Sequence, residues 1–85
     1  MINVALLGFG RIGQMHAQNI YYNKTLNLLY VYEKIDKLRK KAKNLYNCKI
    51  EKNYKKIFSD EKVDIIFISS PTNTHIRFIE EGSKY

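Results

Sequence analysis

The sequence contains a single cysteine, Cys48, among its 85 residues. It therefore cannot form a disulfide within the chain. No cysteine or histidine stands near it at the spacing of metal ligands, so we expect no metal site and a buried or incidental thiol. The chain also lacks an apolar run approaching the roughly 20 residues of a membrane-spanning helix. Its N-terminus has no basic segment ahead of an apolar one, so we predict no secretory signal peptide. These absences favour a cytoplasmic protein.

The length limits the chain to one domain. A chain of 85 residues buries only about 60–65% of its extended surface on folding, which leaves it marginally stable without a partner. There are no internal repeats, no low-complexity tract and no linker. The apolar and charged fractions are ordinary for a globular protein, so disorder is not expected.

Positive charge is in excess, with 15 Lys and Arg against 8 Asp and Glu and a formal net charge of +7. Such an excess can indicate a polyanionic partner such as nucleic acid. Here it lies largely within residues 34–56, in a segment with the pattern of an amphipathic helix and a loop. A basic balance alone is a weak signal, so we interpret these lysines as a solvated surface and do not expect a nucleic-acid partner.

Strand and helix patterns alternate along the chain. The predicted strands cover residues 2–7, 26–32, 48–50 and 63–68. The predicted helices cover residues 11–22, 35–46, 54–58 and 74–84, with a turn at 69–73. Strands that alternate with helices of this length predict an α/β fold with a parallel sheet and right-handed crossovers.

Two of these segments carry a pattern that predicts burial. In the predicted helix 35–46 the apolar positions form one stripe, and lysines and an arginine mostly fill the rest. That stripe consists of Ile35, Leu38, Ala42 and Leu45. The predicted strand 63–68 is apolar on both faces, which is typical of a strand in a parallel sheet that helices cover.

A glycine motif connects the first predicted strand to the first predicted helix. Gly8, Gly10 and Gly13 form G-x-G-x-x-G, and this position after a strand and before a helix is typical of a dinucleotide-binding loop. Gly8 would allow the tight turn, Gly10 would let a pyrophosphate approach the backbone, and Gly13 would let the helix pack closely. The first-turn amides and the helix dipole would then face the phosphates. No Gly-Lys-Ser/Thr follows Gly13, which excludes a Walker loop.

Glu33 stands at the end of the second predicted strand, twenty residues after Gly13. An acidic residue at about this spacing accepts hydrogen bonds from the adenosine ribose of a dinucleotide. It would repel a 2′-phosphate, which favours NAD over NADP. Lys34 and Lys37 lie close in sequence and would partly offset that repulsion. The alternative interpretation of Glu33 is a solvated carboxylate after a strand.

A polar segment, residues 69–75, follows the fourth predicted strand. Ligands of open α/β sheets bind beyond the carboxyl ends of the strands, so its hydroxyls, the Asn73 amide and its backbone are candidates to contact the nicotinamide half of a cofactor. Capping of the next helix by Thr72, Asn73 or Thr74 is the plainer alternative, and both can hold. No partner acid or base can be assigned to His75, which we interpret as structural. His16 is expected to be a packing or surface residue.

Residues 8–17, Gly-Phe-Gly-Arg-Ile-Gly-Gln-Met-His-Ala, resemble the opening of the Gfo/Idh/MocA oxidoreductases, and of inositol 2-dehydrogenase-like members in particular. Residues 63–75 resemble the fourth strand of that family and its Thr/Ser-Pro…His loop. The resemblance covers essentially the whole chain and implies a Rossmann domain that binds NAD(P). It implies pyrophosphate contacts from Gly8, Gly10, Arg11, Ile12 and Gly13, a ribose contact from Glu33, and nicotinamide-ribose contacts from Ser70, Pro71, Asn73 and His75. At position 33, Glu replaces the Asp that is common in the family.

The family implies oxidation of a secondary hydroxyl on a polyol or sugar. Its members continue into a Glu-Lys-Pro segment, whose lysine helps catalysis, and a substrate domain with a catalytic histidine. Residues 1–85 include neither, so we assign no catalytic residue and expect this chain alone to be inactive: the N-terminal part of a dinucleotide-binding domain, whose substrate belongs to a full-length parent. The alternative is a non-catalytic dinucleotide-binding sensor or regulatory module.

The expected architecture is a partial, doubly wound parallel sheet of about four strands in the order 3-2-1-4. In that order the strand at 63–68 is an open, apolar edge. Such edges promote strand pairing between molecules. We therefore expect the isolated chain to self-associate, to be poorly soluble or to be marginally folded.

Overall fold

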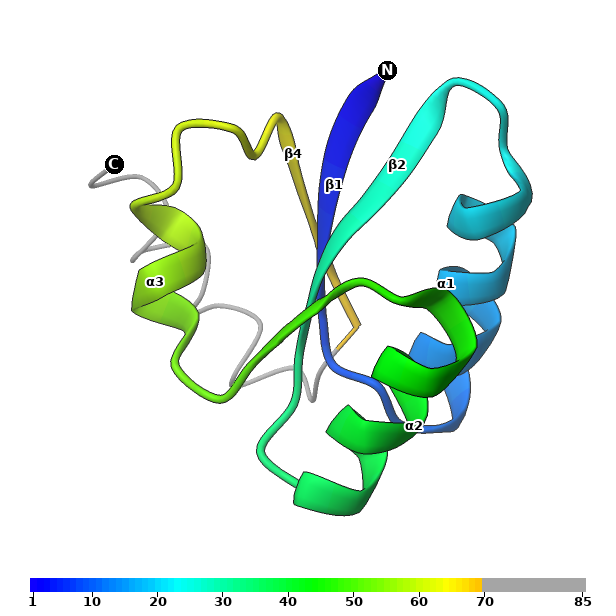
Figure 1. Ribbon diagram of the computed structural model, residues 1–85, viewed down its shortest axis with the longest axis vertical. Coiled ribbons are helices and arrows are strands. Elements are labelled where there is room, and N and C mark those ends of the chain that lie inside the picture. The colour runs from blue at the N-terminus through cyan, green and yellow to red at the C-terminus, as the bar shows by residue number, and fades with distance from the viewer. Residues whose placement is uncertain (70–85) are drawn as a thin grey trace.

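The computed structural model describes residues 1–69 of the chain. The predicted helix 74–84 and all but the first residue of the predicted turn 69–73 lie outside the described residues. In chain order the elements are β1 (Ile2–Leu7), α1 (Arg11–Tyr22), β2 (Leu26–Tyr32), α2 (Asp36–Tyr46), β3 (Lys49–Glu51), α3 (Tyr54–Phe58) and β4 (Ile65–Ile68) (Figure 1). This is the alternation of strand and helix that the sequence predicts.

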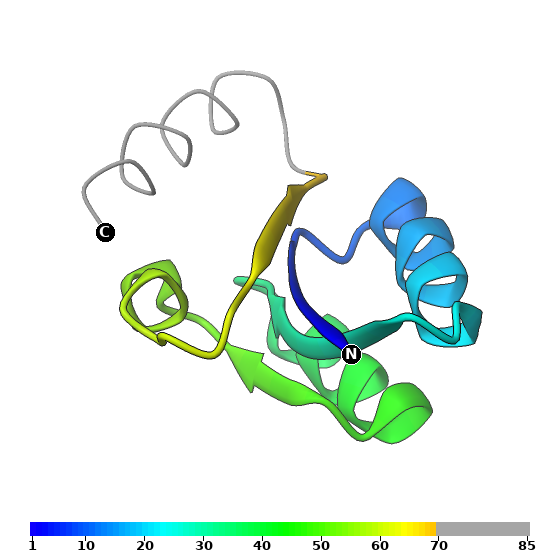
Figure 2. The same ribbon diagram turned by 90° about the horizontal axis from the view of Figure 1, so that it is seen from above.

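The four strands form one parallel sheet in the order β3-β2-β1-β4. The predicted order is therefore confirmed for the described residues. Helices α1 and α2 lie on one side of the sheet and α3 on the other, as the two views in Figures 1 and 2 show. The carboxyl ends of β1 and β2 lie side by side at the same end of the sheet. The glycine loop begins there, directly after β1.

The central strand β1 supplies the two halves of the core. Val4 and Leu6 point toward α1 and α2, and Ala5 and Leu7 point toward α3. All four are at most 1% exposed. A strand that is apolar at consecutive positions is expected where helices cover both faces of a sheet. Because successive side chains of β1 pack on opposite faces, the strand is held between two layers of helices, and the glycine loop begins at its end.

Helix α2 differs from the expected apolar stripe at both ends. It begins at Asp36, because Ile35 is extended (φ −83, ψ 116) and occupies the N-cap position. Ile35 is 56% exposed and Leu45 is 54% exposed, so neither belongs to the core. Ala42 is buried, and Leu38 packs beside it. The helical period predicted the stripe correctly only in the middle of the helix, where the sheet lies beneath it.

The third and fourth strands are displaced from their predicted limits. Cys48 precedes β3 and is buried beneath α2, which confirms the buried thiol; burial raises the pKa of that thiol. Before β4, the amide of Val63 donates to the carbonyl of Asp60 and closes a turn, so the strand begins at Ile65. Ile65 and Phe67 are 44% and 38% exposed, so one face of β4 is not fully covered by residues 1–69.

No helix within the described residues is long and apolar enough to cross a membrane; the longest, α1, has 12 residues.

Candidate functional site

The glycine loop between β1 and α1 depends on two of its glycines for its own shape. Gly8 has a φ of 110°, a backbone conformation that residues with a Cβ rarely adopt. A Cβ placed on Gly13 would lie 2.2 Å from the carbonyl oxygen of Gly8. The structure thus confirms the tight turn at Gly8 and the close packing of α1 at Gly13. At Gly13 the helix packs against the backbone of the turn at Gly8.

Gly10 has no such internal reason to be glycine. Its φ is −73°, which any residue adopts, and a Cβ there would meet nothing within 4 Å. Gly10 is the N-cap of α1, and among the described residues no side chain caps this helix end. The first amides of a helix have no partner within the helix. The positive end of α1 therefore opens onto clear space above Gly10.

Glu33 leaves the end of β2 and connects it to the glycine loop. One carboxylate oxygen accepts a hydrogen bond from the Phe9 amide at 2.9 Å, and the other accepts from the Ile35 amide at 3.1 Å. The side chain is half-buried. Glu33, the residue predicted to bind the ribose, thus contacts the glycine loop, which is predicted to bind the pyrophosphate. The contact is made through Phe9, between Gly8 and Gly10.

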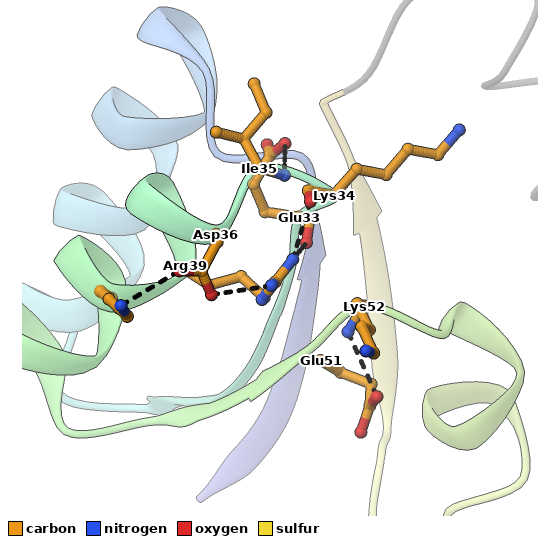
Figure 3. Close-up of polar contacts among 8 residues, drawn as sticks. Glu33, Lys34, Ile35, Asp36, Arg39, Glu51 and Lys52 are labelled. Atoms are coloured by element: carbon orange, nitrogen blue, oxygen red, sulfur yellow. Dashed lines mark hydrogen bonds and ion pairs between the residues drawn. The ribbon is translucent and has the colours of Figure 1, made fainter.

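Helix α2 contains a candidate residue of this site that the sequence did not reveal. Arg39 reaches back from α2 and donates to the backbone carbonyls of Glu33 and Lys34 (Figure 3). Arg39 and Lys40 both pair with Asp36. The hydrogen bond with Lys40 is the largest contribution that holds the pKa of the Asp36 carboxyl below its usual value, and Arg39 adds to it.

A shallow hollow lies beside the glycine loop. Its described lining residues are Gly10, Arg11, Ile12, Gly13, His16, Ile68 and Ser69. The ring of His16 packs on that of Phe67, with 4.6 Å between centroids, which agrees with a packing role. The hollow therefore joins the start of α1 to the carboxyl end of β4, where the sequence predicts the nicotinamide half of a cofactor.

The structure brings together the predicted residues of the first half of the site. Glu33 bonds to the amide of Phe9, between Gly8 and Gly10, and Gly13 packs against Gly8. Arg11 and Ile12 are exposed at the start of α1. The other predicted contacts, Ser70, Pro71, Asn73 and His75, lie outside the described residues. Among residues 1–69, neither Lys34 nor Lys37 forms an ion pair with Glu33. The Lys34 side chain extends away from the Glu33 carboxylate (Figure 3).

Known proteins share this sequence pattern and fold. Residues 2–84 match the model of the Gfo/Idh/MocA oxidoreductase family, NAD-binding Rossmann fold. The myo-inositol 2-dehydrogenase of Thermotoga maritima is 30% identical over 82 residues, which cover 92% of this chain and 24% of that protein. The chain thus spans about a quarter of the length of the curated relatives it matches.

Solved structures agree with the sequence match. A myo-inositol dehydrogenase from Corynebacterium glutamicum superposes with a TM-score of 0.90 at 28% identity, over 99% of this chain and 25% of its own. A protein from Desulfitobacterium hafniense assigned as an NADPH-dependent oxidoreductase gives 0.89 at 25% identity, over 98% of this chain and 24% of its own. Together with the glycine loop and the sheet order, these matches show that the chain belongs to the Gfo/Idh/MocA oxidoreductase family and shares its NAD-binding Rossmann fold.

Proposed function

We propose that residues 1–85 are the N-terminal part of the dinucleotide-binding domain of a nicotinamide-dependent oxidoreductase that prefers NAD. The observation that carries the proposal is the hydrogen bond from the Phe9 amide to the Glu33 carboxylate, 2.9 Å long. It brings an acceptor for ribose hydroxyls to the loop that would hold the pyrophosphate. The two parts of a dinucleotide recognition site support each other in this arrangement.

The start of α1 fits a pyrophosphate. No other part of the protein packs into the space beside Gly10. This space would let phosphate oxygens approach the backbone closely. The uncapped amides of the first turn, which includes Arg11 and Ile12, would donate to these oxygens. The dipole of α1 adds favourable electrostatic energy, because the first turn contains no acidic side chain that would repel an anion.

Glu33 fits the adenosine ribose. A carboxylate accepts about four hydrogen bonds, and the amides of Phe9 and Ile35 use one on each oxygen. Both oxygens therefore retain capacity for the 2′- and 3′-hydroxyls. A phosphate on the 2′ position would instead face the negative charge of the Glu33 carboxylate. The Lys34 side chain points away from that carboxylate and would not offset the charge (Figure 3). This is why the proposal favours NAD, although one structural relative is assigned as NADPH-dependent.

The proposed reaction is oxidation of a secondary hydroxyl of a polyol or sugar, because several relatives are named inositol dehydrogenases. A bound nicotinamide would supply the hydride acceptor. In this chain the residues bind and orient the cofactor; we propose Ser70, Pro71, Asn73 and His75 for the nicotinamide half and no catalytic residue. No relative named above favours the alternative of a non-catalytic sensor.

Calorimetric titration of the 85-residue chain with NAD and with NADP tests the proposal. We expect saturable NAD binding that is tighter than NADP binding. Glu33→Gln should weaken NAD binding about tenfold, the effect of losing a hydrogen bond to a charged group. Glu51→Gln is the matched control, because Glu51 ends the neighbouring strand and its carboxylate accepts from the amides of Lys52 and Asn53 in its own turn. The Glu51 carbonyl, which accepts from the Glu33 amide, is unchanged by this substitution. Equal losses in the two variants, or no binding by a folded chain, would refute the proposal.

We also propose that the chain associates with itself through β4. In the described part of the sheet, β4 pairs only with β1, and Ile65 and Phe67 are exposed on one of its faces. An apolar edge of this kind favours pairing with another strand. Sedimentation velocity should give a mass that rises with concentration. A monodisperse monomer with a sharp thermal transition would contradict this expectation.

A further inference from the structure

Arg39 is a largely buried, hydrogen-bonded charged side chain beside the candidate ribose site. Only 14% of its side chain is exposed, although it belongs to the lysine-rich helix α2. One terminal nitrogen donates to the Glu33 carbonyl at 2.7 Å and to the Lys34 carbonyl at 2.8 Å. The other donates to Asp36 at 3.0 Å. Figure 3 shows the guanidinium inserted beneath the turn that leaves β2.

Hydrogen bonds hold this turn at both ends, and the carbonyls between them, of Glu33 and Lys34, accept from Arg39. Lys34, Ile35 and Asp36 are all exposed, so apolar packing contributes little to its shape. The Glu33 amide donates to the Glu51 carbonyl at 3.1 Å, and the Ile35 carbonyl accepts from the amides of Leu38 and Arg39. The Glu33 carboxylate accepts from the amides of Phe9 and Ile35. The Arg39 guanidinium satisfies two backbone carbonyls that would otherwise need other donors. The Glu33 amide is therefore held by β3, its carbonyl and that of Lys34 by Arg39, and its carboxylate by the amides of Phe9 and Ile35.

We propose that Arg39 is a positioning residue that orders the turn after β2 and so holds the Glu33 carboxylate ready for the ribose hydroxyls. This inference rests on the proposed function. Arg39 does not touch the cofactor; it acts through the backbone of Glu33 and Lys34. A planar guanidinium with five donors can bond two carbonyls and a carboxylate at once, whereas a lysine ammonium has no such fixed geometry.

Lys40 provides a matched control on the same helix. It pairs with the same Asp36, at 3.1 Å, and its side chain is 72% exposed. Lys40→Met removes the same charge and one ion pair, as Arg39→Met does, but leaves the carbonyls of the turn untouched. A difference between these two variants therefore measures the contact with the turn.

The first experiment needs no cofactor. Amide exchange rates of the 85-residue chain, measured by NMR, should rise at Phe9 and Ile35 at least about tenfold in Arg39→Met, because their acceptor is no longer fixed. Core amides such as Leu6 should keep their rates, as should every amide in Lys40→Met. A uniform rise over the whole chain in Arg39→Met, or the same pattern in both variants, would overturn the proposal.

The second experiment measures how strongly the chain distinguishes a ribose with a 2′-hydroxyl from one without it. The wild-type chain should bind ADP about tenfold more tightly than 2′-deoxy-ADP, the effect of one hydrogen bond to a charged group. Arg39→Met and Arg39→Lys should lose most of this discrimination, and Lys40→Met should keep it. Discrimination that survives in Arg39→Met would overturn the proposal. If the folded wild-type chain binds neither nucleotide, the proposed function fails, and the exchange rates still decide whether Arg39 orders the turn.

Discussion

The α-carbon of Gly13 lies so close to the backbone of Gly8 that a Cβ at Gly13 would sit 2.2 Å from the Gly8 carbonyl oxygen. Gly13→Ala should therefore force α1 away from the loop. We expect the free energy of unfolding to fall by about 1–3 kcal/mol, the usual cost of overpacking, although alanine is the better helix former. Urea denaturation followed by circular dichroism measures this. An unchanged midpoint would contradict the close contact.

Gly10→Ala should behave in the opposite way. Apart from its two chain neighbours, the added methyl group meets no protein atom within 4 Å, so the free energy of unfolding should change by less than about 1 kcal/mol. The methyl group occupies the space proposed for the pyrophosphate, so NAD affinity should fall at least about tenfold. Calorimetric titration of both glycine variants checks the pair. Full NAD affinity in Gly10→Ala would mean that the phosphates lie elsewhere.

A hydrogen bond between Tyr30 and Asp60 joins β2 to the turn before β4. The Tyr30 hydroxyl donates to the carboxylate at 2.6 Å. This bond, with burial and the negative charge of Asp60, raises the pKa of Tyr30 from 10.0 to about 12, and the same bond lowers the pKa of Asp60 below 3.8. Tyr30→Phe should therefore lower the thermal midpoint at pH 7.

The pH dependence of that difference follows from the two pKa shifts. The stabilisation by Tyr30 is complete below its unfolded pKa of 10.0 and is lost as the pH rises through about 12. The stabilisation by Asp60 is present above 3.8 and is lost as the pH falls through its lowered pKa. The midpoints of wild type and Tyr30→Phe should thus converge at both extremes of pH. A constant difference at all pH values would rule out this bond as the cause.

Cys48 offers a probe of folding without any substitution. Cys48 is 5% exposed, and burial raises the pKa of its thiol, so the reactive thiolate is scarce in the folded chain. Alkylation by iodoacetamide at pH 8 should be slow in buffer and fast in denaturant, with a transition that coincides with the loss of circular dichroism. Rapid labelling in buffer would show that the segment between α2 and β3 opens locally.

The strands and helices could largely be predicted from the sequence because their apolar residues repeat with clear periods. Deviations occur at element ends, where single hydrogen bonds decide. The amide of Ile35 bonds to the Glu33 side chain, so this apolar residue caps α2 and stays exposed. The amide of Val63 closes a turn on Asp60 and shortens β4. Hydrophobic periodicity contains no information about such bonds.

The candidate site could be predicted where the spacing of particular residue types is typical of dinucleotide binding. The spacing of Gly8, Gly10 and Gly13 and the position of Glu33 indicated the two halves of the site. The contact between Glu33 and the Phe9 amide was not predictable, because it depends on how the ends of β1 and β2 meet. Arg39 was hidden among lysines of α2, and only the folded turn distinguishes its role from that of Lys40.

The central claim is that a dinucleotide lies on the glycine loop against Glu33. NMR titration of the isotope-labelled chain with NAD tests it most directly. The account predicts saturable shifts at the amides of Gly10, Arg11, Ile12 and Gly13 and at Ile35, and unchanged signals at Asn3 and Asn27, whose side chains bond at the opposite end of the sheet. Shifts confined to the lysines of α2, or none in a folded chain, would contradict it.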